Sequence, residues 1–152
     1  MPRYVVPYTA DSCSPTRAFP RRAVIYRPIL PITLINGART FKCYAVVDSG
    51  ADDCLFPYSF GRRIGLKIRT GRKDRFIGVE GRGRYAWYFD IKFSVGSKAV
   101  VTCKARVGFT RSLEEHGCGL LGQTGFFDKF RIVFDYKKGI FQLENEPKTT
   151  AS

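Results

Sequence analysis

Histidine, acidic side chains and long apolar runs are all scarce in this sequence. His116 is the single histidine among 152 residues, so a metal site built from two histidines of one chain is excluded. No apolar run approaches the roughly 20 residues of a membrane-spanning helix. Residues 1–7 are broken by proline and polar side chains and lack the apolar core of a signal peptide. We therefore expect a cytoplasmic protein with no membrane span.

Cysteine is present, but not in a pattern that binds metal. Five cysteines leave one unpaired in any disulfide scheme, and none belongs to a Cys-x-x-Cys pair. The tripeptide His116-Gly117-Cys118 resembles half of a metal site, but no second histidine completes it. We expect a solvated loop there, no bound metal, and reduced, mostly buried thiols at Cys13, Cys43, Cys54, Cys103 and Cys118.

The charge of the chain is strongly one-sided. Lysine and arginine together number 26 against 13 acidic residues, a formal net charge of +13. Such a field attracts nucleic acid, an anionic membrane surface or acidic substrates. The cations are scattered along the chain rather than gathered in one block, which favours a soluble basic surface. Any anionic partner is expected to bind weakly and without specificity.

Strand patterns dominate the chain. Two apolar runs, residues 30–35 and 41–47, flank Asn36-Gly37, a dipeptide that tolerates positive φ and predicts a hairpin. Apolar residues alternate with others over residues 85–93 and again over 99–107, which indicates strands with one buried face. The sequence thus predicts an all-β protein.

Short helices and chain ends complete the predicted organisation. Residues 58–64 and 125–130 are expected to form short helices, and the chain should end in a strand, a Lys137-Lys138-Gly139 turn and a last strand. Residues 1–23 carry proline, serine and arginine without a sustained period and are expected to form a flexible N-terminal arm. One folded domain should then cover residues 24–145, followed by a C-terminal tail at 146–152.

The most informative stretch is the run from Ala45 to Asp53. An apolar strand delivers Asp48 into a Ser49-Gly50 turn, and Asp48 is the one aspartate followed by Ser-Gly or Thr-Gly. Leu120-Leu121-Gly122 follows in the C-terminal third, then Gly125-Phe126-Phe127-Asp128-Lys129-Phe130 and a strand-like segment. In this order, the motifs resemble the retropepsin-like family of single-lobe aspartic proteases, of the bacterial type. The resemblance covers roughly residues 24–143.

The resemblance implies a closed acid-protease barrel with one or two short helices, active as a homodimer. Each subunit would supply one catalytic aspartate, Asp48, and the pair would activate water to hydrolyse a peptide or protein substrate, without metal or organic cofactor. It also implies roles for further residues: an active-site turn at Ser49, Gly50 and Ala51, substrate contacts from Asp52 and Asp53, a flap containing Gly78, Val79, Glu80 and Gly81, and support behind the turn from Leu120, Leu121 and Gly122.

One departure from the family pattern concerns the dimer. Family members often carry arginine after the apolar-apolar-glycine segment, where it pairs with the acidic residue near Asp52, but this chain has Gln123. A neutral hydrogen bond replaces an ion pair there, unless Arg111 or Arg131 substitutes. This departure bears on the strength of the dimer more than on the chemistry. Because retropepsin-like domains can lose catalysis while keeping their fold, the alternative function is a non-catalytic retropepsin-like binding or dimerisation module with a basic surface.

A serine nucleophile is disfavoured. Ser49 would need a small residue two positions before it, where Val47 stands, and His116 is the one histidine available as a base.

Overall fold

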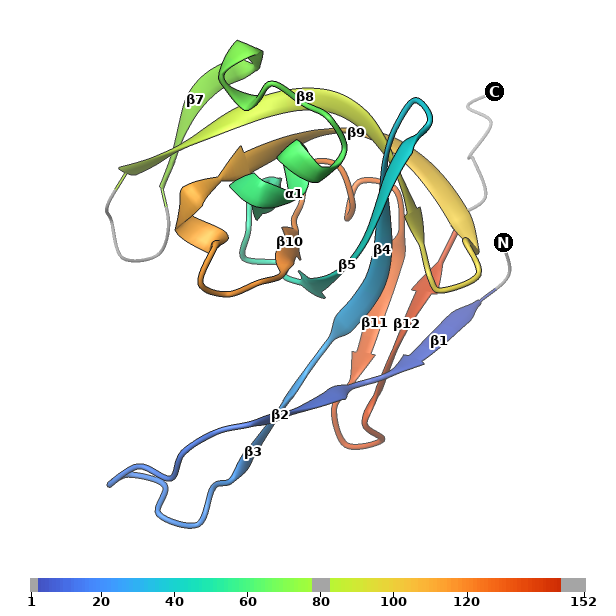
Figure 1. The fold of residues 1–152 in the computed structure, drawn as a ribbon. Helices are drawn as coiled ribbons and strands as arrows, with labels where there is room; N and C mark the ends of the chain where they lie inside the picture. The colour runs from blue at the N-terminus through green and yellow to red at the C-terminus, as the bar shows by residue number, and fades with distance from the viewer. Residues whose placement is uncertain (1–2, 78–82, 146–152) are drawn as a thin grey trace.

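Six strands close into a β-barrel. The computed structural model describes residues 3–77 and 83–145. Around the barrel each strand is hydrogen-bonded to the next, and the pairing of β4 with β8 closes the ring (Figure 1). In spatial order the strands are β4 (Ile29–Asn36), β5 (Arg39–Val47), β10 (Gly119–Leu121), β6 (Cys54–Pro57), β9 (Val101–Thr110) and β8 (Gly83–Val95).

The barrel is filled by aromatic and aliphatic side chains from alternate strand positions. Period-two alternation is clear on β4, where Leu30, Ile32 and Leu34 are almost wholly buried and their neighbours are partly exposed. Fully buried phenylalanines complete the core, namely Phe56, Phe93, Phe109, Phe126 and Phe141. The Asn36-Gly37 hairpin is confirmed, since Gly37 has φ +59° between paired β4 and β5.

On β8 the alternation of apolar and other residues does not match the alternation of buried and exposed side chains along the whole strand. The even-numbered positions were expected to face solvent, yet Ala86 is fully buried. It packs with Leu55 and Leu113 in a second, smaller apolar cluster outside the barrel core. This second cluster lies beside the candidate site described below.

Helical structure is sparse. The helix expected at residues 58–64 is present as α1 (Tyr58–Arg63), and two 3-10 turns occur as η1 (Ile68–Thr70) and η2 (Arg111–Leu113). The helix expected at residues 125–130 is wrong, because that segment forms turns. Gly125 adopts φ +108°, a conformation outside the helical region, and this interrupts any regular helix at its start.

A small sheet joins the two ends of the described chain. It consists of β1 (Tyr4–Pro7), β12 (Ile140–Glu144) and β11 (Arg131–Asp135), in that order. We expected the folded unit to begin near Val24, but β1 pairs with β12 and Val6 is buried against the core. This strand was not predicted because it has only four residues and ends in Pro7, a residue that usually argues against a strand. Strand β1 lies at the edge of its sheet, where proline is tolerated.

The rest of the N-terminal segment projects from the barrel. Strands β2 (Thr9–Ser12) and β3 (Val24–Arg27) pair as a separate two-stranded ribbon that extends away from the body of the molecule (Figure 1). The expected arm is thus a β-hairpin beyond residue 8. Strand β7 (Arg72–Ile77) pairs with β8 and extends the barrel wall on the other side. In the described part of the chain, no helix has the length and apolar character needed to cross a membrane.

Candidate active site

Asp48 lies where β5 ends and a tight turn begins. Its backbone N–H donates to the carbonyl of Leu121 at 3.0 Å, and its own carbonyl accepts from the N–H of Ala51 at 3.2 Å. The carboxylate is fixed as well, because the Gly50 N–H donates to Asp48 Oδ1 at 2.9 Å. Asp48 is half-buried, whereas Ser49 and Gly50 are exposed. These contacts fix the aspartate in direction and leave the turn open to solvent.

The segment after β10 supports the turn from behind. Strand β10 runs parallel to β5, with Leu120 beside Val46 and Leu121 beside Val47. Beyond it, the Gln123 N–H donates to the Ala51 carbonyl at 2.9 Å and the Thr124 N–H donates to the Asp52 carbonyl at 2.9 Å. The turn is therefore hydrogen-bonded to this segment at both ends.

Gly122 packs against the backbone of Ala51 and Asp53 with no room for a side chain. A Cβ atom at this position would lie 2.3 Å from the Asp53 carbonyl oxygen and 2.6 Å from that of Ala51. Both neighbours are backbone atoms, which cannot rotate away as a side chain would. Only glycine fits there, so Leu120, Leu121 and Gly122 do pass directly behind the turn.

Asp48 faces a cavity of about 870 Å³. Its apolar lining includes Val46, Leu120 and Leu113, and Tyr44 reaches it with a largely exposed ring. The other walls come from the base of the β2–β3 hairpin and from the loop after η2, through Thr9, Ala10, Asp11, Arg27, His116, Gly117 and Cys118. Sequence reasoning missed these residues, since they come from segments far apart in the chain and share no local motif.

Asp52 and Asp53 differ in their surroundings. Asp52 is exposed, whereas Asp53 is half-buried and its Oδ2 accepts a hydrogen bond from the Tyr88 hydroxyl at 2.9 Å. Burial, and then this hydrogen bond, raise the pKa of the Tyr88 phenol, which remains a neutral donor. Asp53 lines a second cavity of about 270 Å³, together with Thr124 and side chains of β7 to β9. Asp53 thus faces a different cavity from the one that Asp48 faces.

Gln123 uses its side chain within its own subunit. The Nε2 amide donates to the Ser49 carbonyl at 3.1 Å, so it braces the turn and does not reach Asp52. Within residues 3–77 and 83–145, neither Arg111 nor Arg131 forms an ion pair with Asp52 or Asp53 in place of the arginine that family members carry at position 123. Arg111 lies over the Tyr58 ring at 4.4 Å, and Arg131 pairs with Glu144 at 3.9 Å.

The predicted flap falls on Gly78, Val79, Glu80 and Gly81, which lie outside the described residues. The strands on either side, β7 and β8, are antiparallel and pair up to Ile77 and Gly83. No group of three or more residues suited to hold a metal ion is found in the described ranges. His116 is exposed, and its predicted loop setting is consistent with the turn found there.

Comparison with known proteins identifies the fold. No protein-family model matches the chain, and no curated protein sequence matches it. Among solved structures, the chain is similar to a retropepsin-like aspartic protease from Rickettsia conorii, with 14% identity and a TM-score of 0.61. The match covers 94% of this chain and 99% of that one. The closed six-stranded barrel described above is therefore the retropepsin-like aspartic protease fold that the sequence predicted.

Proposed function

We propose that this protein is an aspartic endopeptidase, a bacterial-type member of the retropepsin-like proteases, that hydrolyses peptide bonds with water activated by two Asp48 carboxylates. One observation carries the proposal. In a retropepsin-like fold, the carboxylate of Asp48 is fixed by the Gly50 amide and faces a cavity of about 870 Å³ with an apolar lining. A cavity of this volume accommodates side chains of a bound peptide.

The chemistry requires two aspartates that share one proton. The ionised carboxylate accepts a proton from water as the water attacks the scissile carbonyl, and the protonated carboxyl donates to the carbonyl oxygen. Two like charges placed close together cannot both remain ionised, and their repulsion separates the two ionisations. This division of roles is general to aspartic proteases.

One suitable aspartate per chain implies a homodimer. The second Asp48 would come from a partner subunit related by a two-fold axis. Ser49 is exposed at the turn, which supports a role for its hydroxyl in bonding to the partner's turn. Gln123 holds the Ser49 carbonyl from within the same chain. The missing arginine at position 123 favours a dimer that dissociates on dilution.

Further residues have proposed roles in substrate binding. Asp52 is exposed beside the turn and Asp53 lies at the edge of the smaller cavity, positions that suit contact with a substrate main chain. Gly78, Val79, Glu80 and Gly81 would belong to a flap that closes over the substrate and excludes water. All five cysteines are free thiols, which supports a reducing, cytoplasmic location.

Replacement of Asp48 by asparagine tests the proposal. Asparagine is nearly isosteric and its oxygen can still accept from the Gly50 N–H, so the fold should persist while cleavage of a diverse peptide library is abolished. Asp128→Asn is the matched control, because Asp128 is an exposed aspartate that does not line the cavity facing Asp48 and has no part in the mechanism. Mass spectrometry of the library at mildly acidic pH provides the measurement.

The dependence of specific activity on protein concentration tests the proposed dimer separately from the proposed role of Asp48. Specific activity should rise with protein concentration until the dimer is saturated, as followed by sedimentation in parallel. Equal cleavage by the parent and Asp48→Asn would refute the assignment of Asp48. A folded, dimeric parent that cleaves nothing at any pH would favour the non-catalytic binding module, which the basic surface of the chain suits.

A further inference from the structure

Four cations lie along the outer surface of β7, β8 and β9. On β8, Lys92 lies directly opposite Lys104 of β9, and Asp90 lies directly opposite Arg106. Tyr88, on the same face of β8, lies opposite Arg72 of β7. We call Arg72, Lys92, Lys104 and Arg106 the basic track.

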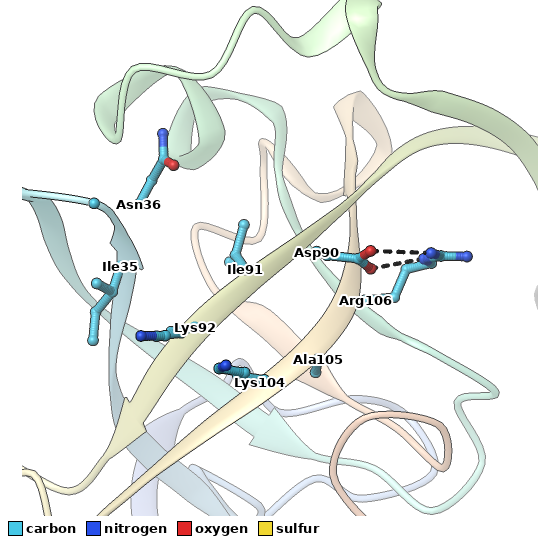
Figure 2. A pocket seen from close by; sticks show the side chains of 9 residues that line it. Ile35, Asn36, Asp90, Ile91, Lys92, Lys104, Ala105 and Arg106 are labelled. Carbon is cyan, nitrogen blue, oxygen red and sulfur yellow. Dashed lines mark hydrogen bonds and ion pairs between the residues drawn. The ribbon is translucent and has the colours of Figure 1, made fainter.

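Lys92 and Lys104 bring like charges together at the far end of the track. Figure 2 shows the two side chains extending in the same direction from neighbouring strands. They line a cavity of about 510 Å³, which also contains Asn36 and the apolar residues Ile35 and Ile91. Like charges directly opposite on paired strands destabilise a sheet. An anionic group bound between the two ammonium groups would remove that repulsion.

The carboxylates near the track already have partners. Asp90 accepts two hydrogen bonds from Arg106, at 2.8 and 3.1 Å, and this hydrogen bonding lowers the pKa of Asp90 (Figure 2). Asp53 accepts from Tyr88, and Asp74 Oδ1 accepts from the Arg75 N–H at 2.7 Å. Within the described ranges, no ion pair is formed by Arg72, Lys92 or Lys104. Their charges remain available to a ligand.

The track leads to the candidate active site. Arg106 lines both the 510 Å³ cavity and the 270 Å³ cavity, and the latter is bounded by Asp53 of the active-site turn. Tyr88 donates a hydrogen bond to Asp53, and Lys92 lies four residues farther along β8. Four residues of a strand span about 13 Å. This length accommodates about four residues of an extended peptide.

From this placement we infer that the basic track is a docking site for an acidic segment of the protein substrate, next to the bond-cleaving site. The inference rests on the proposed protease function. A polypeptide with spaced acidic side chains fits better than nucleic acid, because Asp90 and Asp74 interrupt the track and would repel a continuous row of phosphates. Ile35 also offers an apolar contact to a peptide between its charges.

Binding is tested without cleavage. The probe is a fluorescein-labelled peptide of alternating glutamate and serine, titrated into Asp48→Asn protein and followed by fluorescence anisotropy. The Lys92→Gln/Lys104→Gln double variant should weaken binding about fivefold, since individual surface ion pairs are weak. The matched control is Lys137→Gln/Lys138→Gln, which removes the same charge from the exposed turn between β11 and β12 and should bind like the parent. Affinity should also fall steeply as salt rises.

Three outcomes would overturn the inference. The first is equal weakening in both double variants, which would mean a diffuse charge effect. The second is equal binding of a peptide in which glutamine replaces every glutamate. The third is tighter binding of single-stranded DNA than of the acidic peptide with the same dependence on Lys92 and Lys104, which would assign the track to nucleic acid. Because no step needs catalysis, failure here is distinct from failure of the protease proposal.

Discussion

Gly122→Ala should destabilise the protein more than any ordinary glycine-to-alanine change. The new Cβ would lie 2.3 Å from the Asp53 carbonyl oxygen, about 1 Å inside a normal carbon–oxygen contact. Overpacking of this kind costs about 1–3 kcal/mol. The displaced carbonyl of Ala51 is also the acceptor for the Gln123 N–H, and each backbone hydrogen bond lost from the turn adds about 1 kcal/mol.

The sum is a loss of about 2–4 kcal/mol in the free energy of unfolding. Most domains have about 5–15 kcal/mol in total, so the variant should unfold about 10 °C lower or fail to accumulate in folded form. Urea unfolding followed by circular dichroism measures the change, and the slope of the transition shows whether unfolding remains two-state.

Gly50→Ala is the matched control on the opposite side of the same turn. Its Cβ would lie 3.2 Å from Asp48 Oδ1, a side-chain atom that can move by a few tenths of an ångström. Stability should change by less than about 1 kcal/mol, while cleavage should fall because the carboxylate is displaced. If Gly122→Ala unfolds within about 1 kcal/mol of the parent, the close packing behind the turn does not hold it, and the reasoning is wrong.

Two further predictions concern the polar and titratable groups of the core. Burial raises the pKa of Cys43 and of Cys54 from 9.0 to about 12, so stability should be complete below pH 9 and fall as pH rises toward 12, by about 1.4 kcal/mol per pH unit for each thiol. Urea midpoints across this range, in reducing buffer, should decline less in Cys43→Ala/Cys54→Ala, and an unchanged decline would assign the effect to other groups. Tyr88→Phe keeps the ring but removes the donor to Asp53, and should cost about 1.5–3 kcal/mol. The exposed Tyr85→Phe should cost under about 0.5 kcal/mol, and equal costs would contradict the Asp53 contact.

Features of the fold that are encoded locally could be predicted from the sequence. The Asn36-Gly37 turn needs only two residues that tolerate positive φ, and the alternation over residues 85–93 needs only one strand. Strand β1 could not be found in this way. It pairs Tyr4 with Leu143, at the opposite end of the chain, and its own four residues carry no period long enough to recognise.

The residues of the candidate site also divide into those that stand in a short sequence motif and those that are brought together only by tertiary contacts. Asp48 and Gly122 stand in short motifs that identify them, although their roles in catalysis stay predictions. Tyr88 could not be identified, because the strand pattern placed it on the solvent face and its partner Asp53 lies 35 residues away. The basic track was missed for a similar reason, since its cations are scattered in sequence and are brought together only by the pairing of three strands.

The contacts that hold the turn explain why fold and activity must be tested separately. They are mainly backbone hydrogen bonds, donated by the Asp48 N–H to the Leu121 carbonyl and by the Gln123 N–H to the Ala51 carbonyl, and a variant without a carboxylate would keep them. Among the described residues, the one hydrogen bond of the Asp48 side chain is accepted from the Gly50 N–H, and an asparagine oxygen would accept it equally well. Structure alone therefore does not require aspartate at position 48. A half-buried carboxylate facing a large cavity is better explained by the chemistry it can perform, and a comparison of Asp48→Asn with Gly122→Ala should separate loss of activity from loss of fold.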